Sequence, residues 1–227
     1  MLDITLRPFK DKTFDPLCSV IPQSITPGHL TLMAFLSGLA SCTAIAWGSP
    51  SSAVILWLLN RVLDCLDGAI ARQRNISTDL GGFQDLLCDF IIYSLIPISC
   101  ALGEWQGTSA YHTARLWAAV ACAEASFHVN NFVLLYIAAL TEKQKAANAV
   151  AGGKEKDGMK GRNETKVKEL TSLSMKPALI EGGESGLVFT VMLAVPAWTE
   201  WLCWALAAGV CVGTVQRVFW VTEALQK

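Results

Sequence analysis

Charged residues are scarce in this sequence: they make up 16% of its 227 residues, whereas hydrophobic residues make up 52%. So small a share of charge excludes an ordinary soluble domain of this length. Histidine is also rare, with three residues, and the eight cysteines are scattered without a Cys-x-x-Cys pair. This pattern excludes a zinc site of the usual spacing and favours cysteines that serve as small buried hydrophobic residues.

The first residues lack the basic stretch and long apolar core of a cleaved signal peptide, so we expect the first membrane helix to direct its own insertion. Residues 1–28 mix charged and apolar side chains, and Pro8 and Pro16 interrupt any long helix. They predict a short interfacial segment on the membrane surface, with a poorly ordered tail as the alternative.

Six apolar segments follow, at about residues 30–47, 53–71, 83–102, 114–140, 181–196 and 198–222. Most approach the length of about 20 residues that a helix needs to cross a bilayer. The sequence therefore predicts an all-α fold, an integral membrane bundle of six transmembrane helices. We expect a single domain that occupies residues 1–227.

The connections between these segments differ in charge. Residues 142–176 form the longest polar stretch, with nine Lys or Arg against five Asp or Glu, whereas the connections on the other side hold only Arg115. Because positive loops stay inside, residues 142–176 are predicted to be a cytoplasmic loop with room for a short helix, and both termini are placed on the same face. Tryptophans are expected at the opposite interface: Trp47, Trp105, Trp117, Trp198 and Trp201.

Four aspartates lie where the second and third segments adjoin. Asp64 and Asp67 share one face of a helix, and Asp85 and Asp89 share one face of the next. Carboxylates at membrane depth indicate a functional site. Two such helices facing each other can hold Mg²⁺ or Mn²⁺, which prefer oxygen ligands. There are two alternatives. The aspartates either form a buried charge network without a catalytic role or line a cation pathway in a small transporter.

The same residues resemble the signature of the CDP-alcohol phosphatidyltransferases. Asp64-x-x-Asp67-Gly68-x-x-Ala71-Arg72 is followed after eight intervening residues by Gly81. Asp85 follows after three more intervening residues, and Asp89 after another three. Upstream, residues 26–31 are similar to the Thr-Pro-Asn-x-x-Thr segment that opens the first membrane helix of many members. Here Gly28 replaces the Asn, and His29 is a possible substitute for its polar contact.

The resemblance implies that Asp64, Asp67 and Asp85 hold the metal ions that bind the CDP diphosphate. Asp89 would also lie near the metals and act as the base that deprotonates the attacking hydroxyl. The family motifs place Thr31, Gly68, Ala71, Arg72 and Gly81 at the nucleotide or diphosphate. Gly68 and Ala71 are small enough for close approach of a nucleotide, and Arg72 can pair with either a phosphate or an aspartate.

The acceptor site is less clearly defined by sequence. Glu124, His128 and Asn131 form a polar stripe on the fourth helix, which either binds a polyol or amine acceptor or pairs across a helix interface. Arg61 shares the helical face of Asp64 and could meet an anionic acceptor. Glu181 and Glu184 open the fifth segment, where they either contact substrate or complement the helix dipole.

Together these features predict a transferase that moves a phosphatidyl group from CDP-diacylglycerol to a small alcohol and releases CMP, with Mg²⁺ or Mn²⁺ as cofactor. The acceptors left open are inositol or its phosphate, serine and glycerol 3-phosphate. Alternatives are a CDP-choline or CDP-ethanolamine type phosphotransferase acting on diacylglycerol, and an inactive structural subunit. Family resemblance implies a homodimer among membrane lipids, with the active site at the cytoplasmic face and no nucleic-acid partner.

Overall fold

The computed structural model describes residues 18, 20–104, 110–152 and 182–225. Within these ranges all regular secondary structure is helical. The elements are α2 (Pro27–Ala46), α3 (Pro50–Gln73), α4 (Asp79–Glu104), α5 (Ala110–Gly152), α6 (Gly182–Ala194), the 3₁₀ turn η1 (Pro196–Trp198) and α7 (Thr199–Leu225). The prediction of an all-α fold is confirmed for these residues. Most of the predicted interfacial segment lies outside them.

Local sequence signals fix the ends of the first helices. At the start of α2, the His29 amide donates to Thr26 Oγ1, and the Thr26 amide donates to His29 Nδ1, both at 3.4 Å. This capping box satisfies two amides that the first turn would otherwise leave unpaired. After α2 the chain turns at Gly48, whose φ of 75° suits glycine, and α3 then starts at Pro50.

Helix α4 starts earlier than the sequence predicted, at Asp79 rather than Phe83. Thr78 caps it, because its side-chain oxygen accepts from the Gly81 amide at 3.0 Å and its carbonyl accepts from the Gly82 amide at 3.1 Å. A threonine cap of this kind offsets the low helix propensity of the two glycines. The polar connection between α3 and α4 is therefore shorter than expected.

Helix α5 continues past the predicted end of the fourth span and into the predicted cytoplasmic loop. It reaches Gly152, so residues 142–152 are helical rather than loop. These residues are rich in Ala and Lys, which favour helix even where no apolar pattern is present. The rest of the predicted loop lies outside the described residues.

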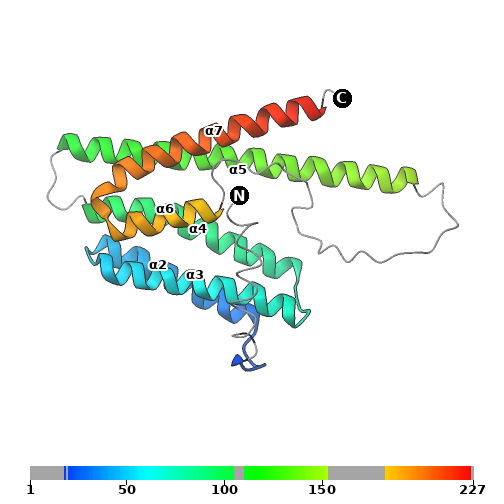
Figure 1. The fold of residues 1–227 in the computed structure, drawn as a ribbon, viewed down its shortest axis with the longest axis horizontal. Helices are drawn as coiled ribbons and strands as arrows, with labels where there is room; N and C mark the ends of the chain where they lie inside the picture. Colours follow the sequence, from blue (N-terminus) through cyan, green and yellow to red (C-terminus); the bar gives the residue numbers. More distant parts are fainter. Residues whose placement is uncertain (1–17, 19, 105–109, 153–181, 226–227) are drawn as a thin grey trace.

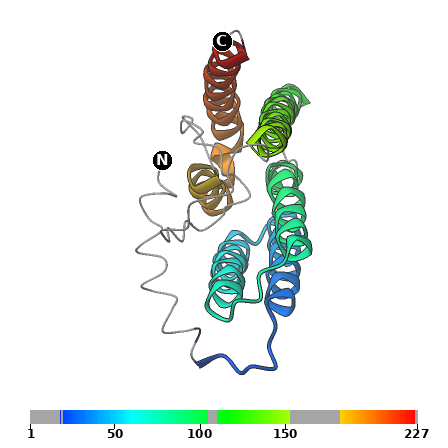
Figure 2. The ribbon, with the colours of Figure 1, turned by 90° about the vertical axis from the view of Figure 1, so that its right-hand side faces the viewer.

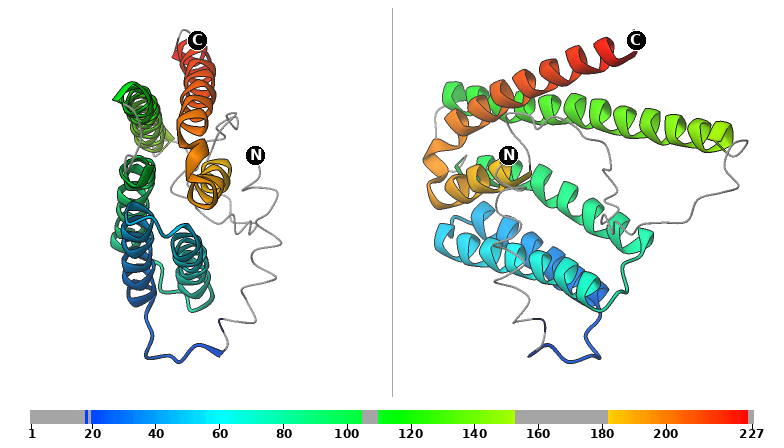
Figure 3. Two further views of the ribbon diagram at one scale, coloured as in Figure 1. Left: turned by 90° about the vertical axis from the view of Figure 1, so that its left-hand side faces the viewer. Right: turned by 45° about the vertical axis from the view of Figure 1, so that its right-hand side comes forward.

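Successive helices run in alternating directions (Figure 1). Helix α2 packs along both α3 and α4, α6 contacts the same two helices, and α5 packs chiefly on α7. The end-on views in Figure 2 and Figure 3 show α5 and α7 as a pair beside the group formed by the other four. The end of α3 and the start of α4 therefore lie at one end of the bundle.

The main apolar core lies away from the end of the bundle where α3 ends and α4 starts. Its fully buried side chains come from all six helices, α2 to α7, and include Trp57, Ile96, Leu116, Phe189 and Leu206. A smaller cluster around Leu30, Leu66 and Ile70 joins the start of α2 to the end of α3. This second cluster fixes the two helices beside the aspartates.

Among the described residues, four helices are long and apolar enough to cross a membrane: α2, α4, the Ala110–Lys143 part of α5, and α7 together with η1. The 24-residue α3 is long enough, but it carries the arginines and aspartates of the motif, which lower its hydropathy. Helix α6 is apolar but has only 13 residues. The structure thus supports a membrane-spanning helical bundle, and the number six stays a prediction.

Candidate active site

The two aspartates of α3 lie on its last three turns, where the helix leaves the apolar core. Asp67 is buried, with 4% of its surface exposed, and Asp64 is half-buried. The buried carboxylate needs a hydrogen-bond donor. Thr31 on α2 supplies it, because its hydroxyl lies 2.6 Å from Asp67 Oδ2. The threonine that the motif assigned to the nucleotide therefore contacts an aspartate in this structure.

The other two aspartates, Asp85 and Asp89, come from the first half of α4 and are half-buried. All four carboxylates lie close enough to repel one another electrostatically: Asp64 is affected by Asp85 and Asp89, and Asp67 by Asp64 and Asp89. The structure thus brings the four predicted residues together at the adjoining ends of two helices, as their spacing indicated. Such a cluster holds an excess of negative charge.

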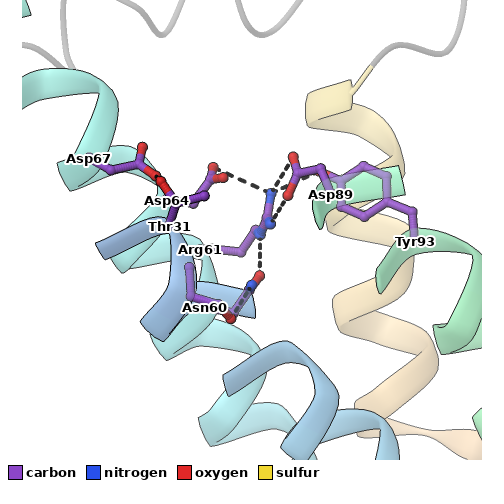
Figure 4. A network of polar contacts seen from close by, with 8 residues as sticks. Thr31, Asn60, Arg61, Asp64, Asp67, Asp89 and Tyr93 are labelled. Atoms are coloured by element: carbon purple, nitrogen blue, oxygen red, sulfur yellow. Dashed lines mark hydrogen bonds and ion pairs between the residues drawn. The ribbon is translucent and has the colours of Figure 1, made fainter. Parts of the chain in front are cut away.

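Arg61 lies between the two helices and partly neutralises this charge (Figure 4). Its Nη2 atom is 2.5 Å from Asp89 Oδ1, and its Nη1 atom is 3.4 Å from Asp89 Oδ2. The same Nη1 atom is 3.5 Å from Asp64 Oδ2. In this structure Arg61 is the counter-ion of two aspartates, and its predicted contact with an anionic acceptor stays a prediction.

Three further side chains contact the guanidinium group. Arg61 Nε donates to Asn60 Oδ1 at 2.7 Å, and Nη1 donates to the Tyr93 hydroxyl at 2.8 Å. The group also lies 4.7 Å from the ring centre of Trp57 and 5.2 Å from that of Tyr93. Sequence analysis missed these residues, although Trp57 and Tyr93 stand four positions from Arg61 and Asp89 and so on the same helical faces.

The donor set fits Mg²⁺ or Mn²⁺ in kind, because it consists of carboxylate oxygens from two helices. In the parts of the chain that the structure describes, however, no three Asp, Glu, His or Cys side chains are gathered closely enough to hold an ion as they stand. Two of the four aspartates are hydrogen-bonded to other side chains: Asp67 to Thr31, and Asp89 to Arg61. The residues fit a metal chemically once Asp89 exchanges Arg61 for the ion, since the Thr31 hydroxyl contacts only one oxygen of Asp67.

The small residues of the motif line the same end of α3. A Cβ atom at Gly68 would lie 3.2 Å from Arg72 Nη1, so this glycine lets the arginine side chain lie against the helix. Ala71 is half-buried one turn beyond Asp67. Gly81 serves α4, since a Cβ there would lie 3.1 Å from the capping oxygen of Thr78. The roles of these residues toward a nucleotide stay predictions.

Arg74, just beyond α3, has a role that the sequence did not indicate. Its guanidinium donates to the carbonyls of Ile25 at 2.9 Å and of Ile21 at 2.8 Å. These bonds tie the segment before α2 to the end of α3. Arg74 thus fixes the position of α2, and with it Thr31, rather than adding a free cation to the site.

The predicted acceptor residues are more dispersed. Glu124 on α5 lies against Ser94 of α4, His128 is exposed, and Asn131 is half-buried. Glu184 is half-buried in the first turn of α6, whereas Glu181 lies outside the described residues. The neighbouring Asn130 points to α7, where its Oδ1 accepts from Arg217 at 2.5 Å and from Thr214 at 3.2 Å. These two bonds join α5 to α7.

Comparison with known proteins agrees with the motif. Residues 24–215 match the family model described as CDP-alcohol phosphatidyltransferase. The chain is 41% identical over 103 residues to the inner membrane protein YnjF of Escherichia coli, covering 45% of this chain and 50% of that protein. It is 32% identical over 101 residues to the archaetidylinositol phosphate synthase of Methanothermobacter thermautotrophicus, covering 44% and 51%. The matched segments span about half the length of these relatives.

The fold also resembles a solved enzyme structure, that of the phosphatidylinositol phosphate synthase PgsA1 of Mycobacterium tuberculosis. The form with CDP-DAG bound superposes with a TM-score of 0.61 at 18% identity, covering 92% of both chains. The form in complex with manganese and citrate gives a TM-score of 0.58 at 17% identity, covering 92% of this chain and 87% of that one. At these identities the likeness establishes the fold alone.

Proposed function

Because the chain belongs to the CDP-alcohol phosphatidyltransferase family, we propose that it transfers a phosphatidyl group from CDP-diacylglycerol to a small alcohol and releases CMP. The observation that carries this proposal is the aspartate cluster. Four motif carboxylates, from α3 and α4, interact electrostatically at one end of an apolar bundle. An excess of negative charge at membrane depth is costly, and cation-assisted chemistry on a diphosphate is a physical reason to keep it.

In this proposal Asp64, Asp67 and Asp85 hold Mg²⁺ or Mn²⁺ together with Asp89, the fourth carboxylate of the metal site. When bound, the metal would neutralise the diphosphate and stabilise the charge that develops on the transferring phosphoryl group. Thr31 supports this assignment, because its hydroxyl fixes which Asp67 oxygen is left for a ligand. Gly68, Ala71, Arg72 and Gly81 would line the approach of the nucleotide.

Asp89 is the proposed base. It takes the proton from the acceptor hydroxyl, whose oxygen forms a bond to the lipid-linked phosphorus while the bond from that phosphorus to the CMP oxygen breaks. The CMP leaves with the electron pair of the broken bond, so atoms and charge balance. Positioned bases of this kind contribute about 10²- to 10⁴-fold in rate.

For the acceptor we propose an inositol-like polyol. The relatives named above are an archaetidylinositol phosphate synthase and, in fold, a phosphatidylinositol phosphate synthase, which supports an inositol ring with or without a phosphate. Arg74 is held by backbone carbonyls and so adds no cation for a phosphate group, which favours the unphosphorylated form. Glu124, His128, Asn131, Glu181 and Glu184 stay candidates for contacts with this acceptor.

We further propose that residues 1–227 form one domain with six membrane spans. Four of them are the helices whose length and hydropathy suffice to cross a membrane, and α3 and α6 are the other two. The aspartates and both termini would face the cytoplasm, on the basis of the positive loops. The homodimer is carried over from the family resemblance alone.

The test is CMP release by the purified full chain in detergent, with CDP-diacylglycerol and either Mg²⁺ or Mn²⁺. Inositol, inositol phosphate, serine and glycerol 3-phosphate are added one at a time. Asp89→Asn should lower the rate by at least about a hundredfold. The matched control is Asp79→Asn, which removes an exposed carboxylate from the first turn of the same helix and should leave the rate unchanged.

Release with inositol and not its phosphate supports the unphosphorylated acceptor, and the reverse replaces it with inositol phosphate. Absence of CMP with every alcohol would contradict the proposed donor. CDP-choline and CDP-ethanolamine with diacylglycerol are then the next pair of substrates to test. Failure of these as well would favour an inactive subunit or a cation transporter.

A further inference from the structure

The guanidinium group of Arg61 occupies the space between Asp64 on α3 and Asp89 on α4. It contacts both oxygens of Asp89, at 2.5 and 3.4 Å, and one oxygen of Asp64 at 3.5 Å. These are two of the four carboxylates through which the proposed function would bind a divalent cation. A guanidinium group and a metal ion cannot both lie between the same two carboxylates, because like charges at this distance repel strongly outside bulk water.

Arg61 is also held by groups other than the aspartates. Asn60 and the Tyr93 hydroxyl accept hydrogen bonds from it, and the rings of Trp57 and Tyr93 lie within 4.7 and 5.2 Å of its central carbon. These rings are themselves fixed. Trp57 is fully buried and donates to Thr190 on α6 at 2.8 Å, and Tyr93 packs against Phe189 with ring centres 5.3 Å apart.

Such a setting lets the guanidinium lose its carboxylate partners without becoming an unpaired buried charge. Aromatic faces and neutral acceptors can stabilise it while Asp64 and Asp89 turn elsewhere. Its side chain is 22% exposed, so water can satisfy the remaining donors. Asp67, in contrast, is held by a neutral hydroxyl, which does not compete with a cation.

We infer that Arg61 is a displaceable counter-ion, which neutralises Asp64 and Asp89 in the metal-free site and releases them when a divalent cation binds. It is a positioning residue, and this role rests on the proposed function for the identity of the cation. Arg61 sets how tightly the site binds metal: it lowers the affinity for divalent cations and, in exchange, stabilises the empty site.

The experiment is a titration of Mn²⁺ into the purified full chain in detergent, without nucleotide, in which free Mn²⁺ is followed by its electron paramagnetic resonance signal. Arg61→Met removes the charge and keeps the length of the side chain. We expect it to bind Mn²⁺ about tenfold more tightly than the unaltered protein, the equivalent of one lost arginine–carboxylate contact. The melting temperature without metal should fall, and the rise on adding Mn²⁺ should be larger.

The matched control is Arg115→Met. Arg115 also contacts a carboxylate, with its Nη2 atom 2.6 Å from Glu200 Oε1, but it lies at the start of α5, at the other end of the bundle. Its removal changes the net charge equally and should leave Mn²⁺ affinity unchanged. A second variant, Tyr93→Phe, removes one neutral acceptor of the guanidinium group. Arg61 should then hold its carboxylates more firmly, and Mn²⁺ should bind a few-fold more weakly.

Equal or weaker Mn²⁺ binding by Arg61→Met would overturn the inference, as would an absence of Mn²⁺ binding in both proteins. If Arg61→Met does not fold, unchanged or tighter binding by Tyr93→Phe overturns it. A raised KM for the acceptor with unchanged Mn²⁺ affinity would return Arg61 to acceptor binding. CMP release is measured on the same preparations. If the unaltered protein releases CMP but Arg61→Met binds Mn²⁺ with unchanged affinity, only the inference is contradicted. If Arg61→Met binds Mn²⁺ more tightly but the unaltered protein releases no CMP, only the proposed function is contradicted.

Discussion

Two arginine–carboxylate contacts lie at opposite ends of the helix bundle, and they differ in the balance of their charges. At the start of α5 and α7, Arg115 pairs with one buried glutamate, Glu200, whose other oxygen lies 4.0 Å from His112 Nε2. At the aspartate end, Arg61 is shared by two carboxylates, and two more lie within electrostatic reach. A balanced contact can serve packing alone, whereas an excess of negative charge calls for a further cation.

The comparison can be tested by removing one carboxylate at each end of the bundle. The largest expected effect is a loss of activity at the aspartate end. Asp67→Asn should lower CMP release by more than about a hundredfold, since even residues that only orient metal ligands cost about 10- to 100-fold. Its melting temperature should not fall, because the amide oxygen still accepts from Thr31 and one repulsive charge is lost.

Glu200→Gln is the counterpart at the balanced end. It weakens the ion pair with Arg115, and a loss of about 1–2 kcal/mol should lower the melting temperature by about 2–8 °C. CMP release at a temperature well below melting should stay within about twofold of the unaltered protein. Loss of release in Glu200→Gln together with normal release in Asp67→Asn would show that charge imbalance does not mark the active site.

A smaller effect is expected for the hydroxyl that holds Asp67. Thr31→Val keeps the shape of the side chain and removes the donor 2.6 Å from Asp67 Oδ2. We expect CMP release to fall by about 10- to 100-fold and to require more Mg²⁺ or Mn²⁺, because the carboxylate is no longer oriented. The measurement is the rate as a function of metal concentration.

Thr43→Val is the control for that substitution. Thr43 lies on the same helix, and its hydroxyl donates only to the carbonyl of Leu39 one turn earlier, at 2.8 Å. Its loss should leave both the rate and the metal requirement unchanged. An equal drop in both variants would mean that the hydroxyl on Thr31 serves the helix and not the aspartate.

The spacing of the motif was enough to predict which carboxylates meet. Asp64 and Asp67, like Asp85 and Asp89, share a face by helical periodicity, and a short connection brings the two faces to one end. Their partners could not be predicted in this way. Thr31 and Asp67 are 36 residues apart, and Arg74 reaches a carbonyl 53 residues away, so these contacts exist only after the helices pack.

The helices themselves were predicted well where apolar runs end at proline or glycine, as in α2 and α3. Two boundaries were missed because hydropathy carries no information about them. The start of α4 depends on the cap of Thr78, and the extension of α5 to Gly152 depends on the helix propensity of polar residues. Both errors lie outside the apolar spans, where membrane length no longer limits the helix.

The smallest expected effect on activity concerns how closely the helices pack at each end of α4. At its last turn a Cβ on Gly103 would lie 2.5 Å from the Ile45 carbonyl oxygen of α2, whereas at its first turn a Cβ on Gly82 would meet nothing within 4 Å. Gly103→Ala should therefore push α2 and α4 apart and cost about 1–3 kcal/mol. Gly82→Ala should leave stability unchanged or raise it by up to about 1 kcal/mol through helix propensity.

Thermal melting in detergent measures both changes in stability. CMP release should stay within about twofold in each variant, because neither glycine contacts the aspartates. If Gly103→Ala abolishes release at a temperature where the protein is folded, the balanced end is not merely structural, since it then controls how the aspartate end is aligned.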